Sequence, residues 1–151
     1  MLPVEEVVGA SSGIGRATAL AFARRGAHVV CAARGAQALD TLVNEVTTAG
    51  GTASAVPTDV ADPVAVRALA TAAEERFGRV DTWVNVAAVS IFGRIEDITD
   101  EEFDRVLRVN FLGHVHGVHA ALPALRRAGG GGMAVLGGGG TVGAAASPVR
   151  G

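Results

Sequence analysis

Apolar positions along the chain alternate between short runs that are apolar throughout and longer segments in which they recur every three or four residues. Short apolar runs are typical of strands buried on both faces of a sheet, and the longer segments are typical of amphipathic helices. The pattern predicts strands ending at Val7-Val8 and over residues 28–33, 52–57, 80–87 and 133–136. It predicts helices over residues 14–25, 36–49, 63–77 and 99–122.

The predicted helices carry recognisable start and stop signals. Gly26 is placed to end the first helix in the left-handed conformation, and Asp62-Pro63 is a strong signal for the start of the third. Thr99 and Glu102 have the spacing of a capping box. Pro123 is expected to kink or end the last helix.

Strands that alternate with helices indicate βαβ units, and right-handed crossovers between parallel strands place helices on both faces of the sheet. The sequence therefore predicts an α/β fold over residues 1–136. It is a Rossmann-like, doubly wound parallel sheet, incomplete at about five strands. Residues 129–151 contain 10 Gly in 23 positions. A segment so rich in Gly buries little surface against its ordering entropy, so residues 137–151 are expected to be a loose tail.

Composition narrows the classes of protein that fit. A length of 151 residues suits one domain, and 49% hydrophobic residues are too many for a disordered chain. The net charge of −2 disfavours a nucleic-acid binder. No signal peptide or bilayer-spanning stretch is visible, so a cytoplasmic protein without membrane contact is expected. Cys31 is the only cysteine, which excludes an intrachain disulfide, and its apolar surroundings predict a buried thiol.

Two features could indicate other partners. All 15 acidic residues lie within residues 1–104, while residues 105–151 hold five Arg and no acid. An anionic partner could explain this imbalance, but the Arg are sparse and a solvated surface is favoured. His114, His116 and His119 could suggest a metal site. Their offsets do not place all three on one helical face, so no metal is expected.

A glycine-rich segment, Gly9-Ala10-Ser11-Ser12-Gly13-Ile14-Gly15, lies between the first predicted strand and the first helix. Its glycines permit tight turns and the close approach of a phosphate. The N-terminus of the helix offers free N–H groups and a positive dipole end to a pyrophosphate. The spacing G-x-x-x-G-x-G differs from the usual dinucleotide fingerprint, and a purely structural turn is the alternative.

The ends of the next two predicted strands carry further candidate contacts for a dinucleotide. A dinucleotide-binding unit places an acid after the second strand when it binds the ribose 2′-hydroxyl. Here Ala33-Arg34 stands at that place, and a guanidinium suits a 2′-phosphate, so NADP(H) is predicted over NAD(H). Arg34 could instead be a solvated loop residue. Asp59-Val60 closes the third strand, where the carboxylate can face an adenine or merely cap a turn.

Asn110 is conspicuous in the last helix because it shares the apolar stripe formed by residues 103, 106, 107, 111 and 114. A polar amide on a buried stripe needs hydrogen-bond partners. An ordinary core asparagine, satisfied by its neighbours, is the alternative to a functional one.

Together these segments resemble the short-chain dehydrogenase/reductase family over residues 7 to about 127. The resemblance implies hydride transfer between a nicotinamide and a carbonyl or alcohol, and it identifies Asn110 with the family's catalytic Asn. In the family's Asn-Asn-Ala-Gly run, Asn85 and Ala87 match, while Val86 and Ala88 do not. The implied cofactor contacts are Gly9, Ser11, Ser12, Gly13, Ile14, Gly15, Arg34, Asp59, Val60, Asn85 and Ala87.

The chain departs from the family's catalytic pattern. The family uses Tyr and Lys for acid/base chemistry and a Ser that polarises the carbonyl. This sequence has no Tyr and no Lys, and Gly137 to Thr141 stands where the Ser is expected. The chain is therefore expected to be a truncated or frame-shifted, inactive oxidoreductase. The alternatives are a non-catalytic dinucleotide-binding or interaction module and a half-enzyme completed by another chain. The resemblance also implies a homo-oligomer through the helix over residues 99–122.

Overall fold

Five parallel strands form the centre of the fold in the computed structural model, which describes residues 1–137 and 142–143. The sheet has the order β3-β2-β1-β4-β5-β6. Its last strand, β6, pairs antiparallel with β5. The strands are β1 (Val4–Val8), β2 (His28–Ala33), β3 (Thr52–Pro57), β4 (Thr82–Asn85), β5 (Gly132–Leu136) and β6 (Val142–Gly143).

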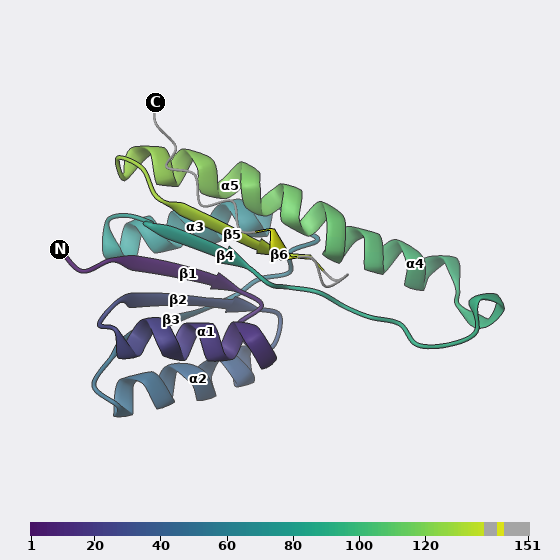
Figure 1. Cartoon of the computed structure of the whole chain (residues 1–151), viewed down its shortest axis with the longest axis horizontal. Coiled ribbons are helices and arrows are strands. Elements are labelled where there is room, and N and C mark those ends of the chain that lie inside the picture. The colour runs from purple at the N-terminus through teal and green to yellow at the C-terminus, as the bar shows by residue number, and fades with distance from the viewer. Residues whose placement is uncertain (138–141, 144–151) are drawn as a thin grey trace.

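Helices cover both faces of the sheet, as predicted for a doubly wound fold. Figure 1 shows α1 (Gly13–Arg24) and α2 (Ala36–Thr48) on one side, and α3 (Pro63–Phe77) and α5 (Gly113–Arg127) on the other. The alternation of side chains along β1 serves both layers. Val4 and Val8 pack with α3 and α5, while Val7 packs with α1 and α2.

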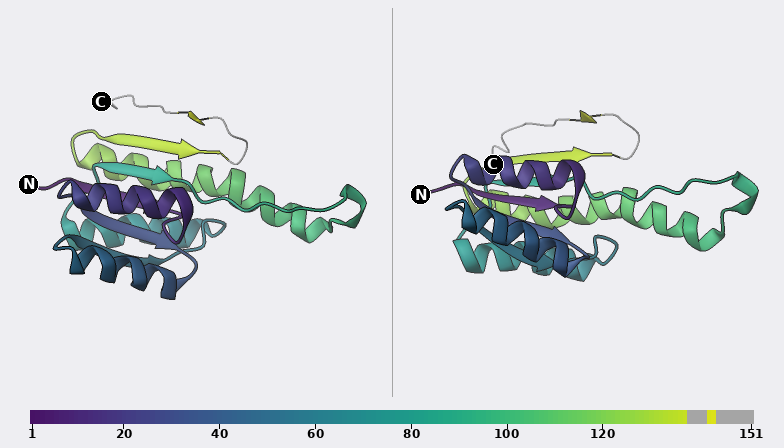
Figure 2. Two further views of the ribbon diagram at one scale, coloured as in Figure 1. Left: turned by 60° about the horizontal axis from the view of Figure 1, so that its bottom comes forward. Right: turned by 90° about the horizontal axis from the view of Figure 1, so that it is seen from below.

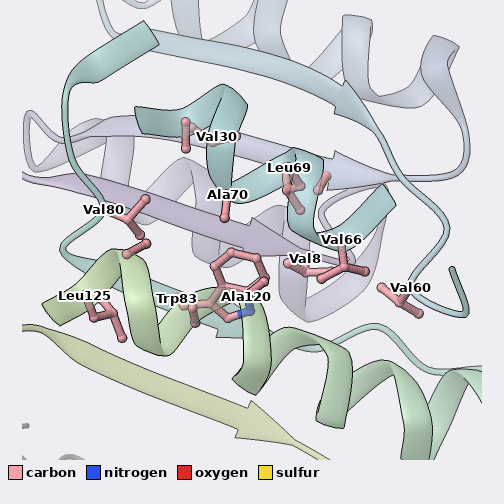
Figure 3. Close-up of a cluster of buried hydrophobic side chains, with 14 of the residues drawn as sticks. Val8, Val30, Val60, Val66, Leu69, Ala70, Val80, Trp83, Ala120 and Leu125 are labelled. Carbon is pink, nitrogen blue, oxygen red and sulfur yellow. The ribbon is translucent and has the colours of Figure 1, made fainter. Parts of the chain in front are cut away.

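The core beneath α3 and α5 is built around Trp83 of β4, which is fully buried. Val8, Val30, Leu69 and Leu125 converge on it from the sheet and from both helices (Figure 3). This packing fixes β1 beside β4, and therefore sets where the carboxyl ends of the two strands meet.

The predicted helix signals are confirmed in detail. The Asp62 side chain accepts a hydrogen bond from the Val64 N–H at 2.8 Å, and Gly78 ends α3 in the left-handed conformation with φ +84°. Both hydrogen bonds of the capping box are present between Thr99 and Glu102. Cys31 is buried, and burial raises the pKa of its thiol to about 12.

The last predicted helix differs from the prediction in two respects. It is divided into α4 (Asp100–Leu107), a π-helical segment η2 (Arg108–Leu112) and α5. The prediction that Pro123 could end the helix is wrong, since α5 continues through it to Arg127. The helical turn around Pro123 includes Ala120, Ala121, Ala124 and Leu125, all buried against the core, and this packing holds the turn in place.

The chain between β4 and η2 forms an arm that projects beyond the sheet (Figures 1 and 2). It contains a short 3₁₀ turn, η1 (Ile95–Asp97), and α4. Three members of the apolar stripe expected to be buried are instead exposed: Phe103 at 41% and Leu107 at 61% in α4, and Phe111 at 64% in η2. The described chain leaves this face uncovered because the arm has no sheet beneath it.

The C-terminal tail is described only in part. Within the segment expected to be loose, Val142–Gly143 pairs with β5, and residues 138–141 and 144–151 lie outside the described part of the chain. No helix among the described residues is both long enough and apolar enough to span a membrane.

Two glutamates of β1 are buried, which the sequence pattern did not predict. Glu6 is 0% exposed, and neither carboxylate oxygen has a hydrogen-bond partner among the described residues. Burial, reinforced by the nearby charge of Glu74, raises the pKa of Glu6 well above its usual value. Glu5 is 8% exposed, and burial raises its pKa as well. The central strand of the sheet therefore carries an electrostatic penalty.

Candidate functional site

The carboxyl ends of the parallel strands border a cavity of about 460 Å³. Residues far apart in the sequence meet there because parallel strands present their carboxyl ends at one edge of the sheet. Ten residues predicted as cofactor contacts line this cavity: Gly9, Ser11, Ser12, Gly13, Ile14, Gly15, Arg34, Asp59, Val60 and Ala87.

The glycine-rich loop is held tightly between β1 and β4. Gly9 has φ +94°, and a Cβ atom at this position would lie 2.8 Å from the backbone nitrogen of Ala87. Gly15 is buried, and a Cβ atom there would collide with the carbonyl group of Gly9. The Gly9 and Ala10 N–H groups donate to the Ala32 carbonyl at 2.8 and 3.0 Å. Gly9 and Gly15 must be glycine because neighbouring backbone atoms fill the space that a Cβ atom would need.

The N-terminus of α1 is free to bind an anion. Its N-cap residue, Ser12, is extended and makes no side-chain capping bond, and the first turn contains no acidic residue. The first N–H groups of a helix have no partner within the helix, and those of α1 begin at Gly13 on the wall of the cavity. Positive potential and unused donors thus coincide at one place.

The end of β2 adds a cation to the cavity. Arg34 is exposed at the rim, and within residues 1–137 its guanidinium makes no ion pair. Thr58, which the sequence analysis missed, is buried beside it, and its N–H donates to the Ala33 carbonyl at 2.8 Å. The rim at β2 therefore presents a guanidinium and no carboxylate.

Asp59, at the end of β3, is held by two groups. Arg105 of α4 donates from Nη1 to Oδ2 at 3.0 Å and from Nη2 to Oδ1 at 3.2 Å. The Ala61 N–H donates to Oδ1 at 3.0 Å. Burial opposes ionisation of Asp59, but these donors and the charges of Arg105 and Arg34 outweigh it and lower its pKa. Arg105 also lines the cavity, and no sequence signal links two residues 46 positions apart.

Asn110 acts as a clamp on the start of the arm. Its Oδ1 accepts from the Val89 N–H and its Nδ2 donates to the Val89 carbonyl, both at 2.8 Å. The amide thus finds the partners that the sequence analysis required, although the stripe on which it lies is largely exposed. Asn110 falls within η2, and the residue that it holds, Val89, lines the cavity.

Asn85 lies beneath the cavity and does not line it. It is 1% exposed, and its Nδ2 donates to the Gly113 carbonyl at 3.2 Å, which ties β4 to the start of α5. Its Oδ1 accepts from the Ala87 N–H at 3.3 Å.

The part of the chain that the structure describes contains no group of three or more His, Cys, Asp and Glu side chains arranged to hold a metal ion.

Comparison with known proteins gives consistent relatives. The profile of the short chain dehydrogenase family matches residues 5–146. An uncharacterized oxidoreductase of Bacillus subtilis, YxnA, is 47% identical over 116 residues, which make up 77% of this chain and 33% of that protein. A 3-ketoacyl-ACP reductase from Sinorhizobium meliloti shares 35% identity and a TM-score of 0.83, covering 88% of this chain and 52% of its own.

A third relative carries a nucleotide in its structure. An alcohol dehydrogenase from the archaeon Thermococcus sibiricus, complexed with 5-hydroxy-NADP, has a TM-score of 0.82 at 34% identity. The match covers 89% of this chain and 57% of that one. The chain thus spans from a third to somewhat more than half of the length of these relatives. The family profile, the sheet order and the glycine loop agree, and the chain belongs to the short chain dehydrogenase family.

Proposed function

We propose that the cavity binds NADP(H), with the phosphate-rich part of the dinucleotide at the glycine loop. The observation that carries the proposal is the combination of an α1 N-terminus without a side-chain cap and the Arg34 guanidinium, which makes no ion pair with the described residues, at the same cavity. A pyrophosphate fits the first site, since the first N–H groups of a helix have no partner within the helix. A 2′-phosphate fits Arg34, since the guanidinium can bind two phosphate oxygens at once.

The remaining lining residues fit the rest of a dinucleotide. Asp59 and Val60 lie at the end of β3, where the carboxylate would accept from an adenine amino group. Ala87 and Val89 follow β4, and Asn110 holds Val89 in position. We assign the nicotinamide to this side of the cavity. When bound, the nicotinamide supplies or accepts a hydride, and the substrate class expected from the family is a carbonyl compound or an alcohol.

Replacing Arg34 with aspartate tests the assignment of the 2′-phosphate. We expect the affinity for NADPH to fall at least about tenfold, because a charge-assisted hydrogen bond contributes roughly 1.5–3 kcal/mol. Affinity for NADH, which lacks the 2′-phosphate, should fall much less. Isothermal titration with both nucleotides measures the ratio. Arg67→Asp is a matched control, since Arg67 is exposed on α3 and does not line the cavity. Equal losses for both nucleotides in Arg34→Asp would contradict the assignment.

We further propose that these 151 residues bind the cofactor without turning it over, as a non-catalytic module or an oxidoreductase lacking its acid/base residues. The support is chemical: the sequence contains no Tyr and no Lys. A proton donor with a tuned pKa contributes about 10²–10⁴-fold to such a reaction. With NADPH and a panel of aldehydes and ketones, the NADPH absorbance should decline no faster than in protein-free solution. Sustained turnover would show that another group serves as the acid.

A further inference from the structure

The ion pair between Arg105 and Asp59 joins two elements that otherwise lie apart. Asp59 follows β3, and Arg105 lies in α4 on the projecting arm. Both residues line the cavity, with side-chain exposures of 41% and 33%. The pair is bidentate, which fixes the plane of the carboxylate as well as its position.

The pair also ties α4 to the sheet. No residue of α4 is buried. Its other polar side-chain contacts among the described residues, Thr99 with Glu102 and Asp104 with Arg108, remain within the helical segment or its cap. The alternative to a functional role is therefore that Arg105 only anchors the arm to the sheet.

The ion pair with Arg105 limits how many further hydrogen bonds the Asp59 carboxylate can accept. An ionised carboxylate has about four lone-pair sites, two on each oxygen. Oδ1 accepts from Arg105 Nη2 and from the Ala61 N–H, so both of its sites are taken. Among the described residues, Arg105 Nη1 is the only donor to Oδ2. One acceptor site remains, on Oδ2, and its direction is set by the guanidinium.

Arg34 is a second positive charge that can attract the Asp59 carboxylate. Its charge acts on Asp59, since it contributes to the lowering of the Asp59 pKa. If Arg105 were absent, the half-exposed carboxylate could turn toward Arg34. Asp59 would then form an ion pair with Arg34, the residue proposed to bind the 2′-phosphate. Arg105 therefore keeps the Asp59 carboxylate away from the Arg34 guanidinium.

We propose that Arg105 is a positioning residue for recognition of the nucleotide base, acting through Asp59. By holding both oxygens, it leaves one aimed acceptor for an exocyclic amino group, so the cavity selects adenine over a base that carries a carbonyl oxygen at that position. This inference rests on the proposed binding of a dinucleotide. It adds a residue from the arm to the determinants of specificity.

The test compares NADPH with its hypoxanthine analogue, which replaces the amino group by an oxygen. We expect the wild-type protein to bind NADPH at least about tenfold more tightly, the size expected for one hydrogen bond to a charged group. Arg105→Ala should reduce this ratio to about threefold or less, with Asp59→Asn giving a similar loss. Arg108→Ala removes a neighbouring positive charge that does not line the cavity, and it should leave the ratio unchanged.

The ratio separates positioning from anchoring, because loss of an anchor alone would weaken the binding of both nucleotides and leave their ratio unchanged. Arg105 favours the carboxylate form of Asp59, so its removal raises the Asp59 pKa toward the usual value. The ratio that remains in Arg105→Ala should therefore decline at a higher pH than the wild-type ratio. If Arg105→Ala melts too low to be titrated, Arg105→Lys, which keeps the charge without the bidentate fork, should still give a reduced ratio.

The outcomes are distinct. An unchanged ratio in Arg105→Ala or Arg105→Lys would overturn the inference, as would wild-type protein that binds the two nucleotides equally. Both of these results would leave the proposed dinucleotide binding intact. Failure of the wild-type protein to bind either nucleotide would instead refute the proposed function.

Discussion

Replacing Glu6 with methionine should stabilise the protein by on the order of 3 kcal/mol at neutral pH. Glu6 lies in β1, between β2 and β4, opposite Val30 and Trp83. It is fully buried, and both carboxylate oxygens lack a hydrogen-bond partner within the described residues. Methionine has a similar length and shape, so it removes the buried acid without opening a cavity.

The gain should depend on pH in a defined direction. Burial raises the pKa of Glu6 in the folded protein above its usual value of about 4.5, so the folded state binds the proton more tightly. The stability contributed by this proton is fully present below the usual pKa and is lost as the pH rises through the raised value. The advantage of Glu6→Met should therefore grow above pH 4.5, by up to about 1.4 kcal/mol for each pH unit.

Urea unfolding of both proteins at several pH values measures this effect. Glu75→Met provides the matched control, because Glu75 is exposed on the adjacent helix α3 and its replacement should change stability by less than about 0.5 kcal/mol. A Glu6→Met variant that is no more stable than wild type, or whose gain is the same at every pH, would show that the Glu6 carboxylate is solvated in the folded protein.

Replacing Gly15 with alanine should reduce the affinity for NADPH by about a hundredfold, or by about 2.7 kcal/mol. The added Cβ would collide with the Gly9 carbonyl, and a side-chain methyl of Val86 would lie 2.9 Å away. Because the Gly9 carbonyl is backbone, it cannot move without opening the loop. The α1 N-terminus would then no longer face the position proposed for the pyrophosphate.

Gly35→Ala makes the same chemical change at a position that tolerates it. Gly35 precedes α2 with φ −83°, and its nearest neighbour to an added Cβ is the Ala38 side chain at 3.9 Å. Titration of both variants with NADPH should show near-normal binding for Gly35→Ala and strongly weakened binding for Gly15→Ala. Circular dichroism should confirm that both variants fold. Wild-type affinity in a folded Gly15→Ala protein would show that the loop is not the phosphate site.

Much of the fold could be predicted because local signals and the global arrangement agree. The boundaries of β2 and β3 match the sequence expectation, because Gly26 and Arg34 flank the apolar run of β2, while Gly51 precedes β3 and Pro57 ends it. The glycine loop, Arg34 and Asp59 were found from their places at strand ends. Parallel topology then brings these positions to one cavity without further information.

The features that escaped prediction depend on tertiary contacts. Glu6 follows no burial pattern, and only the sheet order reveals that its strand is central. The pairing of Arg105 with Asp59 needs the path of the arm, which no local periodicity encodes. Pro123 remains within α5 because neighbouring side chains pack on the core, which overrides the local helix-breaking preference.

All of these expectations depend on an NADP(H) site at the carboxyl ends of the strands. Isothermal titration calorimetry of the wild-type protein with NADPH, and in parallel with NADH, measures whether that site exists. We predict saturable binding of one NADPH per chain, at least about tenfold tighter than that of NADH, as expected for a charged contact to the 2′-phosphate. A folded protein that shows no binding of either nucleotide, or that prefers NADH, would mean that the strand ends do not form an NADP(H) site.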